Sequence, residues 1–311
     1  MRRNVRVLVL GYGEMGHAME TLLGGRVQLD IWEKFPRDGF RSVVLEEAAP
    51  RADYVVFCLP VNPHREVLER ITPLLQPGCI CLSIAKGLDE AGQTAAQILA
   101  DVLADRQPHA LLYGPMISEE IRAGRYAFAQ LGYRERAVYE AIHELFSGTR
   151  LCMEPTRDIT GISWSVILKN VYAIAFGMAD ELRLGDNVRG YLAVASVREL
   201  DRIVLAMGGD AGSPFNLAGL GDLVTTATSE DSHHHTLGRM LARGEREGIE
   251  GEGVHTLQMV ERYRLFEVND YPLFGFIHAI VKEGGDVGVR FEEHLQRHFC
   301  LTDPGHAEPG T

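Results

Sequence analysis

Two lysines have the clearest chemical potential in this sequence, because each lies within or next to a run of apolar residues. Lys86 follows the apolar run CICLSIA, and Lys169 interrupts the apolar helical stretch of residues 162 to 182. Burying an ammonium group costs free energy unless the group has partners or a task. Burial also lowers the pKa of a lysine from about 10.4 toward the range of an acid catalyst. Lys169 is therefore a candidate general acid, although the same pattern fits a lysine whose ammonium reaches the surface.

Four further polar residues could assist such an acid. Lys86 ends a predicted strand, at the edge of a sheet where ligands bind in α/β folds, although surface lysines commonly end strands. Asn170 adjoins Lys169, and Asp222 and Thr226 belong to the segment GLGDLVTT. Without a catalytic task, Asp222 would be an ordinary capping side chain.

Residues 11–16, GYGEMG, fit the pattern GxGxxG and directly follow the apolar run VRVLVL. In this pattern the first glycine permits a tight turn, the second lets backbone approach a pyrophosphate, and the third allows close packing of helix and strand. The phosphates bind at the N-terminus of the following helix. We therefore predict a dinucleotide site; the alternative is an ordinary turn in a Rossmann-like sheet. The residues expected to bind the cofactor here are Gly11, Gly13, Glu14, Met15, Gly16, Pro60 and Lys86.

Glu33 is a second feature of a dinucleotide site, because it ends the second predicted strand 17 residues after Gly16. A carboxylate at this position can accept hydrogen bonds from the adenosine ribose hydroxyls, and it repels a 2′-phosphate. NAD is therefore the expected cofactor. The adjacent Lys34 keeps NADP as a second candidate, and the alternative interpretation is a solvated Glu-Lys pair.

Three consecutive histidines, His233, His234 and His235, follow the segment GLGDLVTT. They could bind a metal, contact a substrate or face water. Metal ligands must converge, and three consecutive side chains on irregular backbone supply at most two ligands, so we predict no metal site. A contact from His233 or His234 to a phosphate or carboxylate and a solvated loop remain as alternatives.

The pattern of apolar runs predicts the elements that hold these residues. Short apolar runs bounded by turn residues alternate with helical patterns in the first half of the chain, which is typical of βαβ units on a largely parallel sheet. The predicted strands are residues 5–10, 27–32, 54–59, 79–84, 110–113 and 127–131, and predicted helices between them include 64–75 and 93–103.

The second half of the chain has a different pattern. From about Asp158 the strand pattern stops, and long helical stretches are predicted near 159–183, 189–208 and 255–283. The predicted fold class is therefore α/β, with an N-terminal Rossmann-type domain over 1–157 and an all-α substrate domain over 158–311. The last eleven residues, LTDPGHAEPGT, are expected to form a loose tail.

Composition limits the classes of partner. The 311 residues are 46% hydrophobic and 24% charged, which is the profile of a globular chain large enough for two cores. Lys and Arg total 31 against 43 Asp and Glu, and the net charge of −12 argues against a nucleic-acid partner. Because Lys169 interrupts the most apolar stretch, no window approaches the roughly 18 uncharged apolar residues of a membrane span. The expected partner is a small-molecule substrate.

The cysteines indicate a reducing compartment. The five cysteines form no CxxC pair, and Cys58, Cys79 and Cys81 lie in apolar strand-like runs. We expect them to be reduced thiols in the core. The apolar run after the basic residues at the start is too short for a signal peptide, so a cytoplasmic location is expected.

The chain resembles the NAD(P)-dependent glycerol-3-phosphate dehydrogenase family over essentially its whole length. Lys-Asn-Val followed later by Gly-Asp-Leu-x-x-Thr carries this resemblance, since it is far more specific than GxGxxG. The matching motifs are GYGEMG at 11–16, AKGL at 85–88, Gly114-Pro115 with Glu120, the DxxG of Asp158 and Gly161, LKNVYAIAFGMAD at 168–180, NxR at 187–189 and GLGDLVTT at 219–226.

The resemblance implies hydride transfer between a nicotinamide cofactor and a small keto or hydroxy substrate, in that family dihydroxyacetone phosphate and sn-glycerol 3-phosphate. Lys169 would be the general acid, and Lys86 would orient the substrate oxygen and lower the pKa of Lys169. The residues implied to position substrate hydroxyls and the Lys169 ammonium are Asn170, Asp222 and Thr226. The resemblance also implies a site in a cleft between two domains, and a homodimer is expected. The substrate-binding residues are expected to be Lys86, Gly114, Lys169, Asp222, His233 and His234.

The departures from the family cluster where substrate specificity would be set. Residues 161–167, GISWSVI, replace the family's Gly-x-Glu-Leu-Gly-Gly-Ala, and Met116 stands where the family has a serine. His233 and His234 occupy the positions of an Arg-Asn pair that grips phosphate, with Arg239 as a candidate replacement cation. The alternative enzyme is therefore a relative acting on a different small oxo compound, in the manner of opine or hydroxyacid dehydrogenases. A non-catalytic dinucleotide sensor is the alternative outside the enzymes, but a pure binding module has no use for a buried acid.

Overall fold

The computed structural model describes residues 5–104, 106–229 and 232–299, so Cys300 and the expected tail lie outside the described residues. The chain forms two compact units. We call Met1–Ile167 with Leu200–Asp222 the sheet unit, and Leu168–Glu199 with Leu223–Thr311 the helical unit. A single division after residue 157 was expected. The chain instead passes between the units after residues 167, 199 and 222, because three helices contribute residues to both units.

The sheet unit is built on one seven-stranded sheet in the order β2-β1-β3-β4-β5-β6-β7. Its strands are β1 (Arg6–Leu10), β2 (Gln28–Trp32), β3 (Tyr54–Phe57), β4 (Ile80–Ser83), β5 (His109–Tyr113), β6 (Ala127–Tyr133) and β7 (Leu151–Thr156). Strands β5 and β6 pair antiparallel, with Leu112 opposite Leu131, and the other described neighbours pair parallel. The largely parallel sheet is confirmed, and β7 is an addition that the sequence did not predict.

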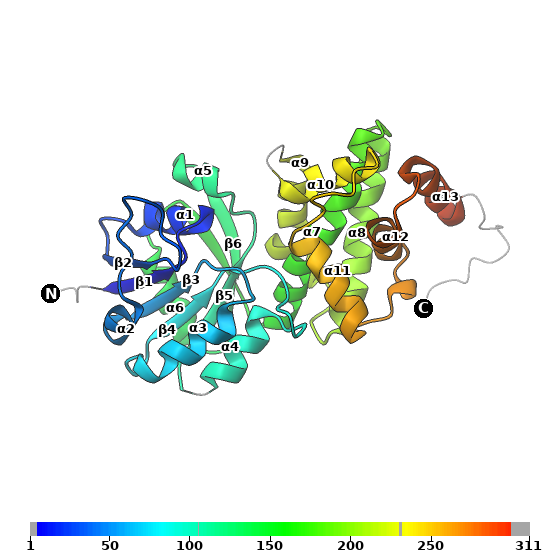
Figure 1. Cartoon of the computed structure of the whole chain (residues 1–311). Coiled ribbons are helices and arrows are strands. Elements are labelled where there is room, and N and C mark those ends of the chain that lie inside the picture. Colours follow the sequence, from blue (N-terminus) through cyan, green and yellow to red (C-terminus); the bar gives the residue numbers. More distant parts are fainter. Residues whose placement is uncertain (1–4, 105, 230–231, 300–311) are drawn as a thin grey trace. The chain divides into compact units, whose positions relative to one another are not determined.

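Helices cover both faces of this sheet. They are α1 (Glu14–Leu23), α2 (Leu45–Ala48), α3 (His64–Ile71), α4 (Ala95–Leu103), α5 (Ser118–Arg122) and α6 (Arg136–Leu145). Apolar residues of α1, α5 and α6 share a core with one face of the strands, including Val7 and Val9. Helices α3 and α4 lie side by side against the other face (Figure 1). This arrangement follows from right-handed crossovers that run outward from β1 in both directions.

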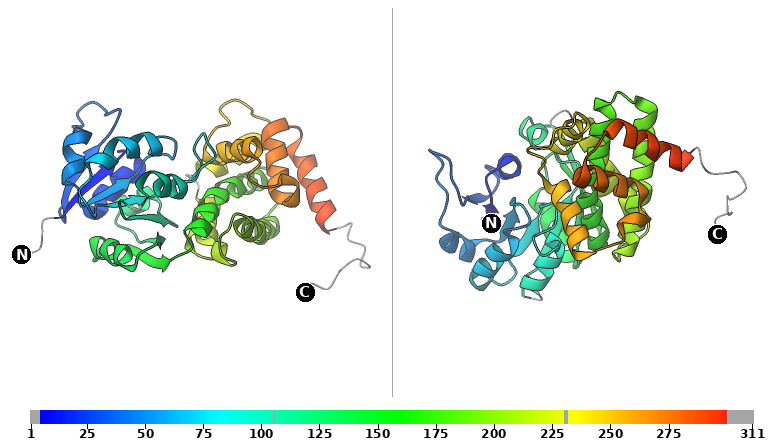
Figure 2. Two further views of the ribbon diagram at one scale, coloured as in Figure 1. Left: turned by 90° about the horizontal axis from the view of Figure 1, so that it is seen from below. Right: turned by 45° about the vertical axis from the view of Figure 1, so that its right-hand side comes forward.

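The helical unit confirms the predicted change of pattern. Its helices, the first three of which also have residues in the sheet unit, are α7 (Ile159–Glu181), α8 (Asp186–Ala206), α9 (Asp222–Thr228), α10 (His233–Ala242), α11 (Glu252–Tyr263), α12 (Pro272–Glu283) and α13 (Val287–Phe299). The stretch 255–283, predicted as one helix, is two helices, because Arg264, directly after α11, has φ +48° and Pro272 begins α12. Helices α12 and α13 lie side by side (Figure 2).

Helix α7 is more apolar than expected from the lysine in its middle. Among the described helices, it alone is long and apolar enough to cross a membrane by length and composition, with a mean hydropathy of 1.4 over 18 residues. The prediction that no window approaches this limit was therefore wrong. However, 89% of that window is buried within the protein, and helices that are apolar all round also form the cores of large proteins.

A buried histidine fixes the end of β4, three residues before Lys86. The Nδ1 of His64 donates to the carbonyl of Pro60 at 2.8 Å, so its Nε2 accepts a hydrogen bond from the Ser83 hydroxyl at 2.9 Å. The Ser83 Oγ in turn accepts from the Ala85 N–H at 3.2 Å. Burial lowers the pKa of His64 to about 4, because the charged ring would lose its hydration.

Between pH 6.5 and 4, the wild-type protein should lose about 3 kcal/mol more unfolding free energy than a His64→Gln variant. The unfolded chain takes up a proton at the ordinary imidazole pKa of 6.5, whereas the folded ring stays neutral down to about 4. This contribution is therefore complete above pH 6.5 and is lost as the pH falls through the interval. Urea unfolding at a series of pH values measures it; parallel pH profiles for the two proteins would show that the folded ring titrates normally.

The cysteines are consistent with the predicted reduced state. Cys58, Cys79, Cys81 and Cys152 are free, and Cys79 and Cys81 are buried in the sheet. Burial raises the pKa of the Cys79 thiol to about 12, which disfavours the reactive thiolate. Cys152 differs from the others because it is exposed on β7.

Candidate active site

The glycine-rich turn between β1 and α1 needs two of its glycines for packing. Gly11 has φ +96°, and a Cβ there would lie 2.7 Å from the carbonyl oxygen of Cys58. A Cβ at Gly16 would overlap the carbonyl oxygen of Gly11. Gly13 is different, because a Cβ there would meet nothing within 4 Å. The absence of a side chain at Gly13 therefore leaves open space beside the start of α1, as a closely approaching phosphate requires.

The N-terminus of α1 fits the same ligand. Its N-cap residue is Gly13, and no side chain caps the helix. The first-turn N–H groups and the helix dipole favour a phosphate at such an end. The side chain of Glu14 pairs with Arg122 at 3.1 Å, and Met15 packs half-buried against the core. The side chains of Glu14 and Met15 are thus engaged elsewhere, and it is the backbone N–H groups of this turn that suit a dinucleotide phosphate.

Glu33 lies where the sequence predicted, at the end of β2 beside the glycine-rich turn. Its carboxylate accepts hydrogen bonds from the Tyr12 N–H at 2.8 Å and from the Phe35 N–H at 3.0 Å. A negative charge is thereby fixed next to the turn. Lys34 points to another partner, Glu66, at 3.6 Å, and is half exposed.

A Glu33→Gln variant should narrow the preference for NADH over NADPH by about tenfold, because it removes a charge that repels a 2′-phosphate. Glutamine keeps an oxygen that can accept one of the two backbone hydrogen bonds, so the turn is largely preserved. The measurement is the ratio of kcat/KM for the two cofactors. A wild-type protein that already prefers NADPH would assign the choice to Lys34 instead.

Lys86 forms an ion pair within the sheet unit. Its Nζ lies 2.6 Å from Oδ2 of Asp222, whose side chain is 4% exposed, whereas that of Lys86 is 21% exposed. The Lys86 Nζ also lies 3.4 Å from the carbonyl oxygen of Gly114. A Cβ at Gly114 would lie 2.5 Å from the carbonyl oxygen of Phe128, so the turn after β5 needs glycine. The structure therefore groups three predicted site residues, and Lys86 keeps an accessible side.

Lys169 is buried in α7, with 5% of its surface exposed, and does not reach the surface. Its Nζ donates a hydrogen bond to Oγ1 of Thr226 at 2.5 Å. Thr226 lies four residues after Asp222 in α9, so the two side chains share one face of that helix. Helix α9 therefore carries both Asp222, the ion-pair partner of Lys86, and Thr226, the hydrogen-bond partner of Lys169.

Asn170 has a partner that sequence reasoning missed. Its Nδ2 donates to Oε2 of Glu252 at 3.0 Å, and Asn170 itself is buried. Glu252 is the first residue of α11 and stands between Gly251 and Gly253, with a Cβ at Gly253 only 2.9 Å from the Asn170 carbonyl oxygen. An acidic residue at the start of a glycine-flanked helix was the available signal.

The three histidines lie in the first turn of α10. The prediction that they lie on irregular backbone was therefore wrong. Ser232 caps the helix, with its Oγ accepting from the His235 N–H at 3.3 Å. His233 Nε2 donates to the carbonyl of Glu250 at 2.7 Å, and His234 Nε2 accepts from the Gly253 N–H at 3.2 Å. These two rings therefore hold the segment that leads into α11.

His235 and Arg189 belong to an ion cluster in the helical unit. His235 Nε2 donates to Oδ2 of Asp180 at 2.7 Å, and an Arg189 nitrogen lies 3.4 Å from Oδ1 of the same carboxylate. Arg239, the candidate replacement cation, lies 3.8 Å from Glu181. In the part of the chain that the structure describes, no three His, Cys, Asp or Glu side chains form a metal-binding group. The phosphate contact of His233 or His234 stays a prediction.

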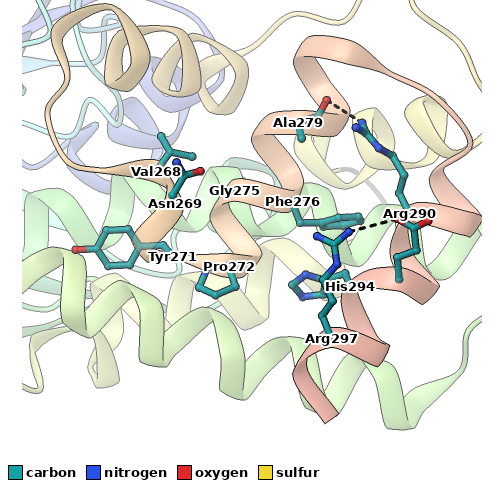
Figure 3. A pocket seen from close by; sticks show the side chains of 11 residues that line it. Val268, Asn269, Tyr271, Pro272, Gly275, Phe276, Ala279, Arg290, His294 and Arg297 are labelled. Carbon is teal, nitrogen blue, oxygen red and sulfur yellow. Dashed lines mark hydrogen bonds and ion pairs between the residues drawn. The ribbon is translucent and has the colours of Figure 1, made fainter. Parts of the chain in front are cut away.

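The helical unit also contains a cavity of about 420 Å³ (Figure 3), whose lining residues come later in the chain than the predicted site residues. It is lined by η5 (Val268–Asp270), α12 and α13. Arg290 donates to the carbonyl of Ala279, and Arg297 lies 3.9 Å from Glu293. None of the predicted site residues lines this cavity, so we assign it no part in the chemistry.

The sheet topology and the side-chain geometry together define a class of protein. A parallel sheet with a phosphate-accepting turn after β1 and a carboxylate after β2 is typical of nicotinamide-dinucleotide binding. A buried lysine and a second, ion-paired lysine are groups of the kind that dehydrogenases use to transfer protons and to orient an oxygen. The chain is therefore a dinucleotide-dependent dehydrogenase by class.

Comparison with known proteins narrows this class. Residues 34–138 match the family described as NAD-dependent glycerol-3-phosphate dehydrogenase N-terminus, and residues 158–291 match the corresponding C-terminus. Glycerol-3-phosphate dehydrogenase (NAD(P)+) 1 of Mycobacterium bovis is 31% identical, over 100% of this chain and 98% of the relative. The enzyme of Nitratidesulfovibrio vulgaris is 29% identical, over 94% of this chain and 98% of its own length. The chain belongs to the NAD-dependent glycerol-3-phosphate dehydrogenase family.

A solved structure supports the same fold. Glycerol-3-phosphate dehydrogenase from Coxiella burnetii has a TM-score of 0.83 and 24% identity, with 94% of this chain and 99% of that chain covered. The predicted family and fold class are confirmed, as are the activity as a dehydrogenase and the NAD(P) cofactor.

Proposed function

We propose that this chain reduces dihydroxyacetone phosphate to sn-glycerol 3-phosphate and catalyses the reverse reaction. The observation that carries the proposal is Lys169, a buried lysine hydrogen-bonded to Thr226 on the helix that also presents Asp222 to Lys86. The names of the relatives support the choice of substrate.

The proposed chemistry needs one proton and one hydride per turnover. The nicotinamide, when bound, supplies the hydride that reaches the carbonyl carbon. The Lys169 ammonium donates its proton to the carbonyl oxygen, which would otherwise become an alkoxide, and regains a proton from solvent. Thr226 accepts a hydrogen bond from Lys169 Nζ and so orients the donor. The Lys86 ammonium, held by Asp222, attracts and orients the substrate oxygen.

The test is oxidation of NADH, followed at the cofactor absorbance, with a panel of small ketones, ketose phosphates and 2-oxo acids. We expect dihydroxyacetone phosphate to give the highest kcat/KM. A higher kcat/KM for an unphosphorylated or carboxylate substrate would favour the related dehydrogenase acting on a different oxo compound. His233 and His234 hydrogen-bond to residues 250–253, and this observation supports the second candidate because both rings already have partners within the chain.

If His233 contacts the phosphate, His233→Arg should lower KM for dihydroxyacetone phosphate, because arginine carries a permanent charge and can donate two hydrogen bonds. His233 donates through Nε2 to the Glu250 carbonyl, so its neutral ring has no second N–H to offer an anion. His234 is left in place, since it accepts from the Gly253 N–H. Steady-state reduction of dihydroxyacetone phosphate by the two proteins measures KM. An unchanged KM in His233→Arg would leave the two histidines with only a structural role, in which they hold residues 250–253.

We further propose a cytoplasmic homodimer. Free, buried thiols such as Cys79 and Cys81 support a reducing compartment, and the family resemblance motivates the dimer. Sedimentation of the purified protein and fractionation of its source cells test these two statements separately.

A further inference from the structure

The segment that leads to Asp222 is fastened to the sheet unit by side chains that take no part in the proposed proton transfer. Asp201 accepts a hydrogen bond from the Gly212 N–H at 2.7 Å. Gln130 accepts one from the Ala218 N–H at 3.0 Å. The second bond lies much closer in sequence to the catalytic ion pair, because Ala218 is four residues before Asp222.

Gln130 lies in the middle of β6, and its side chain is 5% exposed. Its neighbours on the adjacent strands are Tyr113 of β5 and Glu154 of β7, so rigid sheet surrounds its backbone. The Oε1 of Gln130 is therefore held in one place. A side chain on a strand positions a partner more accurately than a side chain on a loop does.

The partner of Gln130 belongs to a π-helical turn, η4 (Leu217–Gly221), which continues directly into α9. Turns of this kind are rare and occur mostly at functional sites. Ala218 is fully buried, and a Cβ at Gly219 would overlap the carbonyl oxygen of Pro214. The N–H groups at the start of a helical segment have no partner within it, so the buried Ala218 N–H depends on Gln130.

We propose that Gln130 is a positioning residue for the reaction: by holding the Ala218 N–H, it fixes the turn that sets the Asp222 carboxylate against Lys86. The proposal rests on the proposed function, in which Lys86 orients the substrate oxygen. The hydrogen bond of Gln130 goes to η4, so its effect is expected to reach Lys86 through η4 and Asp222.

The main variant is Gln130→Met, which keeps the length of the side chain and removes the oxygen. A small misplacement of a catalytic group costs up to about 10²-fold in rate, so kcat should fall by about 10- to 100-fold. NADH affinity should stay within about twofold of wild type, because the glycine-rich turn is untouched. Gln130→Glu keeps an acceptor oxygen and should restore most of kcat. Equal losses in Gln130→Met and Gln130→Glu would overturn the proposal.

The matched control is Gln97→Leu in the same unit. Gln97 Oε1 also accepts a backbone N–H, that of Thr94 at 2.8 Å, where it caps α4. Both Gln97→Leu and Gln130→Met should lower the melting temperature, but only Gln130→Met should lower kcat. If Gln130→Met does not fold, Ala218→Pro removes the same bond from the donor side, and proline is tolerated in the first turn of a helix. The same loss of kcat is expected there.

A second readout needs no substrate. When Asp222 is displaced, the Lys86 amine becomes a freer nucleophile, so its rate of acetylation by acetic anhydride should rise severalfold. Mass spectrometry of the labelled peptides measures this rate in Gln130→Met, Gln97→Leu and wild type. An unchanged Lys86 rate in Gln130→Met would overturn the positioning role whatever the substrate is. A wild-type protein that does not reduce dihydroxyacetone phosphate would instead overturn the proposed function alone.

Discussion

Replacing Lys169 with alanine should lower kcat by about 10²- to 10⁴-fold, while NADH binding stays near the wild-type value. Lys169 is the buried lysine of α7, and its Nζ is held by Thr226 at 2.5 Å. Without its ammonium, the developing alkoxide has no proton donor at that position. Steady-state reduction of dihydroxyacetone phosphate gives kcat, and quenching of protein fluorescence on titration with NADH gives the cofactor affinity.

Two further variants separate catalysis from packing. Lys169→Met keeps most of the side-chain volume, and its kcat should be as low as that of Lys169→Ala. Lys282→Ala removes a half-exposed lysine of the same unit, paired with Glu261 on the surface, and should keep wild-type kcat. Retention of most of the turnover in Lys169→Met would remove this residue from the mechanism.

The parts of the fold that were predictable are those where burial is continuous. Strands β1 and β4 read as apolar runs, because parallel strands covered on both faces bury nearly every side chain. Strand β7 was missed because it is an edge strand: Leu151 is buried, whereas Glu154 and Pro155 are exposed. A proline within a run argues against a central strand but is tolerated at an edge.

The start of α10 was missed for a related reason. Its first turn has histidines where an amphipathic helix would begin its apolar stripe, so the periodicity gave no sign of a helix. The available signal was Ser232, a residue type that commonly caps helices. Because a helix directs three consecutive side chains outward in different directions, the histidines contact different groups and do not converge on one ligand.

The residue types of the site were predictable, but their partners were not. Lys169 was identified because burying a charge in an apolar helix costs free energy unless the charge has a partner or a task. Glu252 and Gln130 did not, since their contacts join residues 82 and 88 positions apart, and spacing in the sequence carries no information about such pairs. Local patterns therefore identified the candidate acid, whereas tertiary structure identified what holds the surrounding groups in place.

Lys86 and Asp222 should behave as one unit in a double-mutant cycle. Lys86→Met and Asp222→Asn should each lower kcat/KM by about 10²-fold, since oriented electrostatic groups contribute on this scale. The Asp222 carboxylate is buried and lies 2.6 Å from the Lys86 ammonium, so removal of either partner misplaces or abolishes the same cation. The double variant should therefore be little worse than either single variant, whereas independent effects would multiply to about 10⁴-fold.

An exposed ion pair in the same unit provides the control for this cycle. Arg136 and Glu140 pair at 3.0 Å on α6, with both side chains more than half exposed. Replacing either or both should leave kcat/KM unchanged, because exposed pairs contribute little. If the losses for Lys86→Met and Asp222→Asn instead multiply, the two side chains act on different steps. Asp222 would then contact the substrate directly, and the ion pair would not be the means by which Lys86 is held toward the reacting oxygen.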